Sequence, residues 1–362
     1  MATVGERAEN WGLRIQGASL WVLFPVLLML QILKTGVRVP YSEHIPSQVA
    51  KFPVPHDFHG GLSLILPGVA RLLHIQGKPG YIAMSFAITV ACLAAVAWLL
   101  DRASGKQRLP LLLFLLGPVT MVMLGGITYH DPLVMTGFAL VTFGRGPASL
   151  VAGGLLAALA HPELAIVGLS CLLITTLSAT FRPWLGRAAL GLPLSVAVFA
   201  GLRYWAHVNG VTLSRFEVAA RGEYPLAPLN FLSNCPLELL ILLWPLGLPI
   251  LLQLVVSGRP RDWLCVVPGA FALPLSLAIV ALDQTRDSVL AACPSLFLGL
   301  LITRNALETA GVHKRIPEGT LLCCAAVLFY VAPLVQITYT GHPMSPHSQL
   351  VHEFFREMPV GW

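Results

Sequence analysis

The chain has 362 residues, of which 56% are hydrophobic and only 11% are charged. Soluble domains carry roughly 25% charged residues, so this composition excludes a water-soluble protein. The mean hydropathy of +0.75 predicts a polytopic integral membrane protein. The net charge of +6 is spread over short connections, which argues against a nucleic-acid partner. We therefore expect a single transmembrane domain over residues 1–338, followed by a tail over 339–362.

A membrane-crossing helix needs about 20 apolar residues. By this criterion the sequence predicts an all-α bundle of roughly eleven spans. In chain order they are 18–33, 80–100, 109–127, 132–143, 149–160, 162–179, 188–205, 236–256, 263–282, 288–303 and 319–338. The pair 132–143 and 149–160 is short, so it forms either tilted spans or a re-entrant hairpin buried in protein.

Lys and Arg in the short connections predict the orientation, because such residues favour the cytoplasmic side. The connections 101–108, 180–187, 257–262 and 304–315 are basic, whereas 126–131, 161–163 and 283–287 are not comparably basic. This pattern predicts a cytoplasmic N-terminus and an extracytoplasmic C-terminal tail. The longer loops 34–79 and 206–235 then lie outside.

The first outer loop is interrupted by four prolines, at positions 40, 46, 53 and 55, which prevent a continuous helix. Residues 61–76 after them form an apolar segment of the length of an interfacial helix. We expect this segment either to lie on the outer membrane surface or to pack over the bundle as a lid.

Acids, histidines and an arginine gather on this outer side from five separate parts of the chain. They are Glu43, His44, His56, Asp57, His59, His130, Asp131, His161, Glu163, Asp283 and Arg286. One such residue alone is commonly an ordinary helix-end residue in headgroup water. Ionisable groups near membrane depth are costly, however, so a one-sided gathering indicates a functional site.

A divalent metal is an alternative explanation for part of this set. The residue types suit zinc or manganese, and the ligands would come from His56, Asp57, His59, His130 and Asp131. No standard zinc spacing is present, and the sequence indicates no other cofactor. The commonest role of such histidines is hydrogen bonding to headgroups, substrate hydroxyls or neighbouring carboxylates.

The order of these features resembles the GT-C superfamily of membrane glycosyltransferases. Glu43 lies after the first span like the family's loop acid, and the motif Asp131-Pro132-Leu133 is similar to a second acid that opens a later span. Residues 152–161 resemble a Gly/Leu/Ala-rich family helix that ends in a basic residue, here His161 instead of the common lysine. Residues 286–294 resemble the family's arginine followed by an apolar helix with an early proline. The resemblance covers about 18–303.

The resemblance implies transfer of a sugar from a polyprenyl-phosphate carrier to a glycan, lipid or protein acceptor, with inversion at the anomeric carbon. Glu43 is our candidate general base, with Asp131 or Asp57 as alternatives. Arg286 is our candidate for the donor phosphate, because a guanidinium binds phosphate through two donors. Further basic candidates lie at or beyond the end of the span 188–205: Arg203, Arg215 and Arg221. The remaining outer-side histidines and acids are candidate substrate contacts.

Two other functions fit the same composition. A transporter of a sugar or lipid-linked precursor commonly shows internal repeats and polar groups near mid-membrane, whereas this sequence shows no clear repeat and places its polar groups at span ends. An envelope polysaccharide polymerase would use a longer outer loop with several arginines, for which 206–235 is the candidate. In each case the expected location is a bacterial inner membrane, among membrane lipids.

Overall fold

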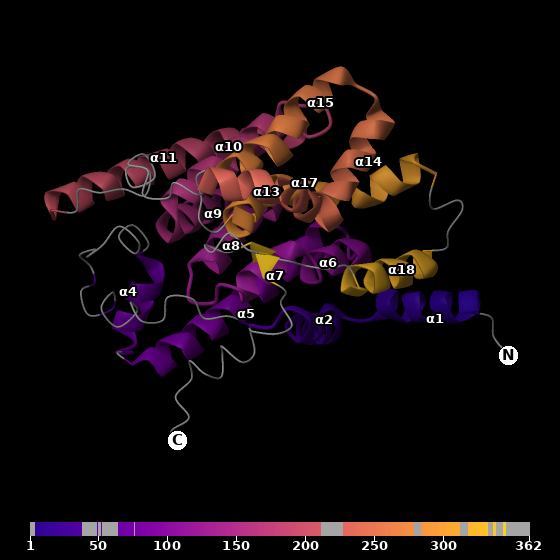
Figure 1. Ribbon diagram of the computed structural model, residues 1–362, viewed down its shortest axis with the longest axis horizontal. Helices are drawn as coiled ribbons and strands as arrows, with labels where there is room; N and C mark the ends of the chain where they lie inside the picture. The colour runs from indigo at the N-terminus through magenta and orange to yellow at the C-terminus, as the bar shows by residue number, and fades with distance from the viewer. Residues whose placement is uncertain are drawn as a thin grey trace.

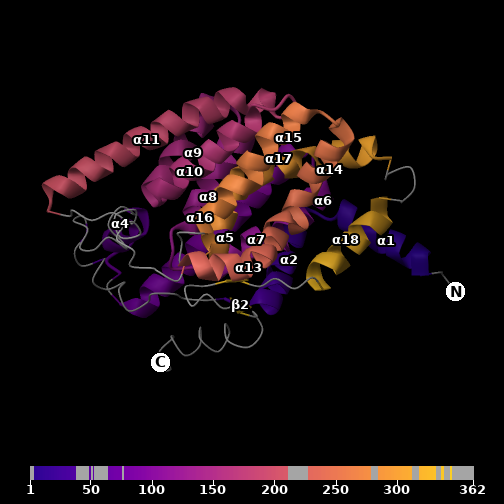
Figure 2. The same ribbon diagram turned by 45° about the horizontal axis from the view of Figure 1, so that its top comes forward.

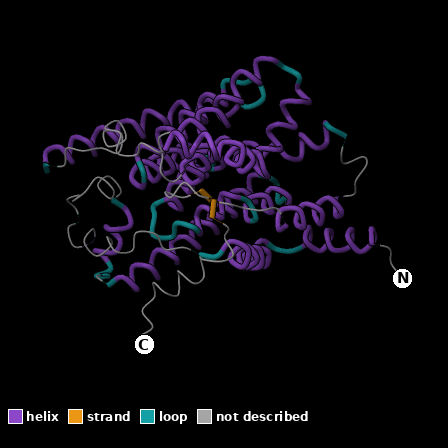
Figure 3. Tube along the Cα trace, in the orientation of Figure 1, coloured by secondary structure: helices purple, strands orange, loops and turns teal. Residues whose placement is uncertain are grey.

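The computed structural model describes residues 4–37, 49, 52, 64–75, 77–210, 227–278, 284–311, 318–331, 336–337 and 343–344. Apart from turns and short loops, these residues are helical, except for two strands of two residues each, β1 (Gln336–Ile337) and β2 (Pro343–Met344), which pair antiparallel. The helices pack into one bundle (Figure 1) and are joined largely by short connections (Figure 3). The predicted helical class is therefore confirmed for this part of the chain.

The helices of the first half, in chain order, are α1 (Val4–Gly17), α2 (Leu20–Thr35), α4 (Ile65–Leu72), α5 (Lys78–Ala103), α6 (Arg108–Leu115), α7 (Pro118–Leu124), α8 (Asp131–Phe143), α9 (Gly146–Ala160) and α10 (Pro162–Thr176). A 3-10 turn (Arg182–Trp184) leads into α11 (Leu185–Val208). The second half contains α13 (Ala227–Leu242), α14 (Leu248–Ser257), α15 (Pro260–Val267), α16 (Leu273–Ala278), α17 (Gln284–Thr309) and α18 (Glu318–Val331), with π-helical turns at Leu243–Gly247 and Pro268–Ala272.

Three stretches among the described residues are long and apolar enough to cross a membrane on their own. They are Lys78–Ala103, Arg182–Val208 and Thr285–Thr303. A fourth arises if the residues Glu9–Gly17 of α1 and the helix α2, between which the chain bends by 119°, count as one broken span. The count of about eleven crossings and their orientation stay predictions, since α8, α9, α10 and α14 are apolar but shorter.

Several expected boundaries differ from the observed ones. The span expected over 109–127 is broken into α6 and α7 at Gly117 and Pro118, because the proline at the start of α7 has no N–H to continue the first helix. The spans expected at 236–256 and 263–282 each contain a π-helical turn. The strand β1 (Gln336–Ile337) lies inside the span expected over 319–338, so the helical span does not reach that limit.

Helices at the periphery of the bundle expose apolar side chains, which is the arrangement that surrounding lipid favours. On α2 the exposed side chains include Trp21, Val26 and Leu33, whereas polar Gln31 and Lys34 are buried. The helix α11 lies along the periphery in both views (Figures 1 and 2) and exposes Leu190 among its large apolar side chains. A water-facing helix would show the opposite polarity.

Close helix packing at the centre depends on small residues, as is common in membrane helix pairs. A Cβ added at Gly137 of α8 would lie 2.6 Å from the Gly153 carbonyl oxygen of α9, and a Cβ added at Gly153 would lie equally close to the Gly137 oxygen. The aromatic ring of Phe138 occupies the space over Gly168 of α10, where an added Cβ would approach it to 2.5 Å. These contacts fix the positions of α8, α9 and α10 relative to one another.

Polar side chains hold together the end of the bundle at which α8 and α10 finish. Arg187 at the start of α11 donates from Nε to the Val141 carbonyl oxygen at 2.5 Å. Buried Asp262 of α15 accepts from the Ala179 backbone N–H and the Thr180 hydroxyl, each at 2.9 Å. Each of these contacts joins residues that the pattern of basic loops had assigned to one side.

Arg108 joins two further elements in the same way. It pairs with Asp101 at the end of α5 and donates from Nη2 to the Ala18 carbonyl oxygen at 2.8 Å, next to the bend between α1 and α2. The sequence pattern had placed all three residues on the cytoplasmic side.

Candidate functional site

An ion pair at the other end of α8 forms the centre of the candidate site. Arg286 in the first turn of α17 donates from Nε to Oδ2 of Asp131 at 2.5 Å and from Nη2 to Oδ1 at 2.7 Å. The Asp131 residue is fully buried and Arg286 is 8% exposed. This two-point pairing of a planar guanidinium with a carboxylate is the strongest geometry for such a contact.

Local sequence brings these two side chains together. Asp131 opens α8 with Pro132 at the next position, where proline favours the start of a helix. The Arg286 guanidinium carbon lies 4.1 Å from the centre of the Tyr129 ring, a cation–π contact. Gly126 leaves room for this ring, because a Cβ there would lie 2.6 Å from Tyr129 Cδ2 and 3.4 Å from Asp131 Oδ2.

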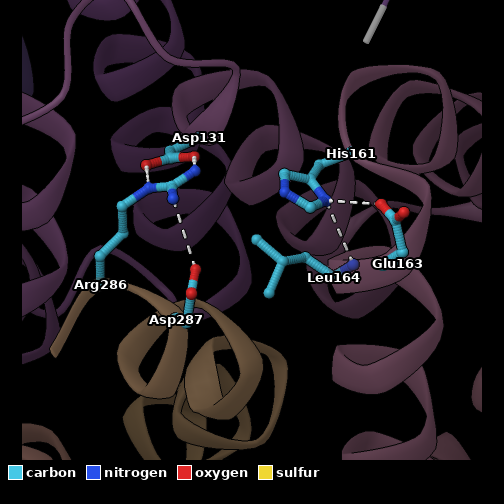
Figure 4. Close-up of polar contacts among 6 residues, drawn as sticks. All are labelled: Asp131, His161, Glu163, Leu164, Arg286 and Asp287. Atoms are coloured by element: carbon cyan, nitrogen blue, oxygen red, sulfur yellow. Dashed lines mark hydrogen bonds and ion pairs between the residues drawn. The ribbon is translucent and has the colours of Figure 1, made fainter. Parts of the chain in front are cut away.

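A second carboxylate lies beside the same guanidinium. Oδ1 of Asp287 is 3.4 Å from Nη1 of Arg286, and the Asp287 side chain is 21% exposed. One arginine therefore faces two acids, of which Asp131 is enclosed by protein and Asp287 is partly open (Figure 4).

A histidine and a glutamate mark the junction of α9 and α10, drawn in the same close-up (Figure 4). His161 Nδ1 accepts from the Leu164 backbone N–H at 3.4 Å and lies 3.4 Å from Glu163 Oε2. One ring nitrogen cannot accept and donate at once. The neutral ring therefore caps α10, whereas the protonated ring donates to Glu163; both residues are largely buried.

The two groups share one end of the bundle. His161 follows the last residue of α9. This helix runs antiparallel to α8, because Gly137 lies against Gly153 and Ala157, whereas Gly144 lies against Ser149. The surface segment expected over 61–76 is also at this end. It forms the shorter helix α4, and the Leu64 backbone N–H preceding it donates to the Leu159 carbonyl oxygen at 3.2 Å.

Seven predicted site residues lie outside the described residues: Glu43, His44, His56, Asp57, His59, Arg221 and Asp283. Their roles stay predictions. Of the proposed metal set, His130 and Asp131 are described, and both Asp131 oxygens accept from Arg286. No group of three or more His, Cys, Asp or Glu able to hold a metal occurs within the described ranges.

Sequence reasoning did not single out three polar residues at this end. Asp287 follows Arg286 directly, but proximity in sequence does not show which of several acids faces the guanidinium. Gln31 and Lys34 are buried on the inner face of α2. The signal for them was available, since both are polar residues in or beside the first apolar run.

Comparison with protein-family models, with curated proteins and with solved structures finds no match to this chain. The functional argument therefore depends on the site itself.

Proposed function

We propose that this protein is a membrane glycosyltransferase that moves a sugar from a polyprenyl-phosphate carrier to a glycan, lipid or protein acceptor. The proposed location is a bacterial inner membrane, with the Asp131–Arg286 end of the bundle on the extracytoplasmic side. The reaction inverts the anomeric carbon, with Glu43 as the general base.

The observation that carries this proposal is the buried Asp131–Arg286 pair at one end of an apolar bundle. Burying two charges has a desolvation penalty of several kcal/mol per ion. Replacement of such a pair by apolar residues is often neutral or stabilising, so stability alone does not account for it. Charged residues within membrane bundles are rare and costly, and they commonly mark functional sites.

The geometry of Arg286 suits it to a phosphate ligand. Asp131 accepts from Nε and Nη2 and so fixes the plane of the guanidinium. The edge formed by the two Nη atoms faces away from that carboxylate, with Asp287 beside Nη1, and a guanidinium edge binds two phosphate oxygens. An arginine held in this orientation stabilises the charge that develops on a departing polyprenyl phosphate.

The test is a transfer assay with purified protein in lipid nanodiscs and a panel of polyprenyl-phosphate sugars, following release of polyprenyl phosphate. We expect Glu43→Gln to lower kcat by about 10²–10⁴-fold, because the amide cannot take the acceptor proton. We expect Arg286→Lys to weaken donor binding, because a lysine lacks the planar pair of donors.

Asp57→Asn and Asp131→Asn are the controls for the base. Full transfer by Glu43→Gln together with loss in Asp57→Asn would move the base to Asp57. If the wild-type protein consumed none of the donors, the enzyme proposal would be wrong and the transporter would become the leading hypothesis.

A further inference from the structure

Each of two exposed tryptophans has an arginine over its ring. The Arg102 guanidinium carbon lies 5.6 Å from the centre of the Trp98 ring on α5, and that of Arg14 lies 5.7 Å from the Trp11 ring on α1. Both are cation–π contacts. Trp98 is 43% exposed and Trp11 is 62% exposed, and both arginines are exposed. The acid nearest to Arg14 on α1, exposed Glu9, is five positions away and so does not share its face.

The two Trp–Arg pairs lie at one corner of the bundle. Arg108 joins the elements that carry them, because it pairs with Asp101, next to Arg102 at the end of α5. The same guanidinium donates to the Ala18 carbonyl oxygen at 2.8 Å, directly after the end of α1. Arg14 is about one helical turn before Ala18. The C-terminal ends of α1 and α5 therefore lie beside each other.

The length of α5 indicates where this corner lies in the membrane. The helix is long and apolar enough to cross a bilayer, so its last turns lie where hydrocarbon changes to headgroups. Trp98 and Arg102 are in these turns. An indole ring prefers this boundary, because its body is apolar and its N–H donates a hydrogen bond. An arginine near the end of a span extends its guanidinium toward the headgroups.

The charge of the corner favours an anionic lipid. The Asp101–Arg108 pair is neutral, so the positive charge comes from Arg14, Arg102 and the exposed Lys106. Within the part of the chain that the structure describes, none of these three side chains pairs with a carboxylate. A guanidinium binds phosphate through two parallel hydrogen bonds, and an anionic leaflet attracts each basic side chain near its surface.

We propose that this corner, formed by the Trp11–Arg14 and Trp98–Arg102 pairs, binds the headgroups of anionic phospholipids. The indole rings lie at the top of the acyl chains, and the guanidinium groups over them bind lipid phosphate. In the predicted orientation these lipids belong to the cytoplasmic leaflet. The lipid surface does not depend on the proposed transfer reaction, so the two are tested separately.

The first experiment measures binding of phosphatidylglycerol to the purified protein in detergent by native mass spectrometry. We expect Arg14→Gln and Arg102→Gln each to weaken the tightest binding by about fivefold, the effect of one basic side chain at an anionic surface. Their melting temperatures should stay unchanged, because both side chains are exposed. Phosphatidylcholine should bind all of these proteins equally.

Arg145→Gln is the matched control. Arg145 is exposed before α9, and among the described residues no aromatic ring lies under its guanidinium. The substitution removes the same charge but no Trp–Arg pair. We therefore expect it to leave the tightest binding of phosphatidylglycerol unchanged.

The second experiment locates the rings by tryptophan fluorescence in nanodiscs made of phosphatidylcholine and phosphatidylglycerol in equal parts, with bromine on the acyl chains of one lipid at a time. Brominated phosphatidylglycerol should quench the protein more strongly than brominated phosphatidylcholine. Trp98→Phe and Trp11→Phe should each remove part of this difference. Arg102→Gln should remove the part that belongs to Trp98 although the ring remains, because the lipid is no longer retained beside it.

Equal quenching by the two brominated lipids would indicate ordinary contact with the bilayer and would overturn the proposal. A loss of phosphatidylglycerol binding in Arg145→Gln as large as in Arg102→Gln would also overturn it, since charge alone would then explain the binding. If Trp11→Phe left the quenching by both lipids unchanged, another occupant, such as a second copy of the chain, would cover α1, and the two-pair surface would be wrong.

Discussion

At the scale of single residues, the buried side-chain amide of Gln31 is unusual for its lack of hydrogen bonds among the described residues. The residue is fully buried on the inner face of α2, and neither its oxygen nor its nitrogen has a hydrogen-bond partner among the described residues. A buried polar group in this state lowers stability by about 1–3 kcal/mol.

Replacement of Gln31 by leucine should therefore stabilise the protein. We expect Gln31→Leu to raise the free energy of unfolding by about 1–3 kcal/mol, because a side chain of similar size fills the same space without unpaired polar atoms. Thermal unfolding in detergent measures this change. Ser85→Ala is the matched control, since the buried Ser85 hydroxyl also has no partner among the described residues, and it should shift in the same direction. A lower melting temperature for Gln31→Leu would contradict the prediction.

The sequence singled out individual candidate residues but not the contacts between them. Asp131 and Arg286 were both predicted, because ionisable residues at the ends of apolar runs are rare. Their direct contact was not predicted, since 155 positions separate them and no local rule brings them together. Asp131 is buried and Asp287 is partly exposed. This difference arises from the packing of the helices, which composition and residue order do not show.

Among the secondary-structure elements, α8 and α9 depend on backbone contact. Gly137 and Gly153 approach so closely that a methyl group at either position meets a carbonyl oxygen. Backbone atoms cannot rotate away as a flexible side chain can. The two helices therefore behave as one unit that carries Asp131 at one end.

Substitution at this contact should separate the helices. We expect Gly137→Ala to lower the melting temperature markedly, because the added Cβ would lie 2.6 Å from the Gly153 carbonyl oxygen. Gly201→Ala in α11 is the control. No atom lies within 4 Å of a Cβ added there, and alanine favours a helix over glycine by up to about 1 kcal/mol. Equal effects of the two substitutions would show that the α8–α9 contact is looser than described.

Element boundaries were the least predictable part of the fold. The sequence showed the apolar runs, but it did not show that Pro118 starts a new helix or that π-helical turns interrupt two spans. The helix α1 was not predicted, because its residues are too polar for an apolar criterion. It forms nevertheless by packing against α18, to which it runs close in Figure 1.

For the whole molecule, two contacts agree with the grouping that the pattern of basic loops predicts, while the number of crossings stays a prediction. Arg187 donates to the Val141 carbonyl oxygen, and Arg108 donates to the Ala18 carbonyl oxygen. Both pairs are expected to share a side if each successive crossing reverses the direction of the chain. Alternate connections are predicted to lie on the same side because each crossing reverses the direction of the chain. Which end faces the cytoplasm stays a prediction, since it depends on the membrane and the insertion machinery rather than on packing.

Reporter fusions test this orientation. We expect cytoplasmic signals at Gly105, Gly258 and Gly311 and an outside signal at Gly210; all four glycines have a left-handed backbone at helix ends. Gly341, which lies outside the described residues, should also report the outside. A cytoplasmic signal at Gly341 would mean that the number of crossings is even where we expect it to be odd.

The shortness of α8 has a consequence for depth in the bilayer. Asp131 and Val141, the latter bound by Arg187, are ten positions apart on one helix, which is roughly 15 Å along its axis. The hydrocarbon layer is about 30 Å thick, and any tilt of the helix shortens the vertical separation further. If α8 crosses the membrane, its two charged contacts reach headgroups on both sides only where the bilayer thins around the helix or where a hydrated vestibule extends down to one of the arginines. A re-entrant α8, the alternative predicted from its length, would bring only one of the two contacts to the membrane surface.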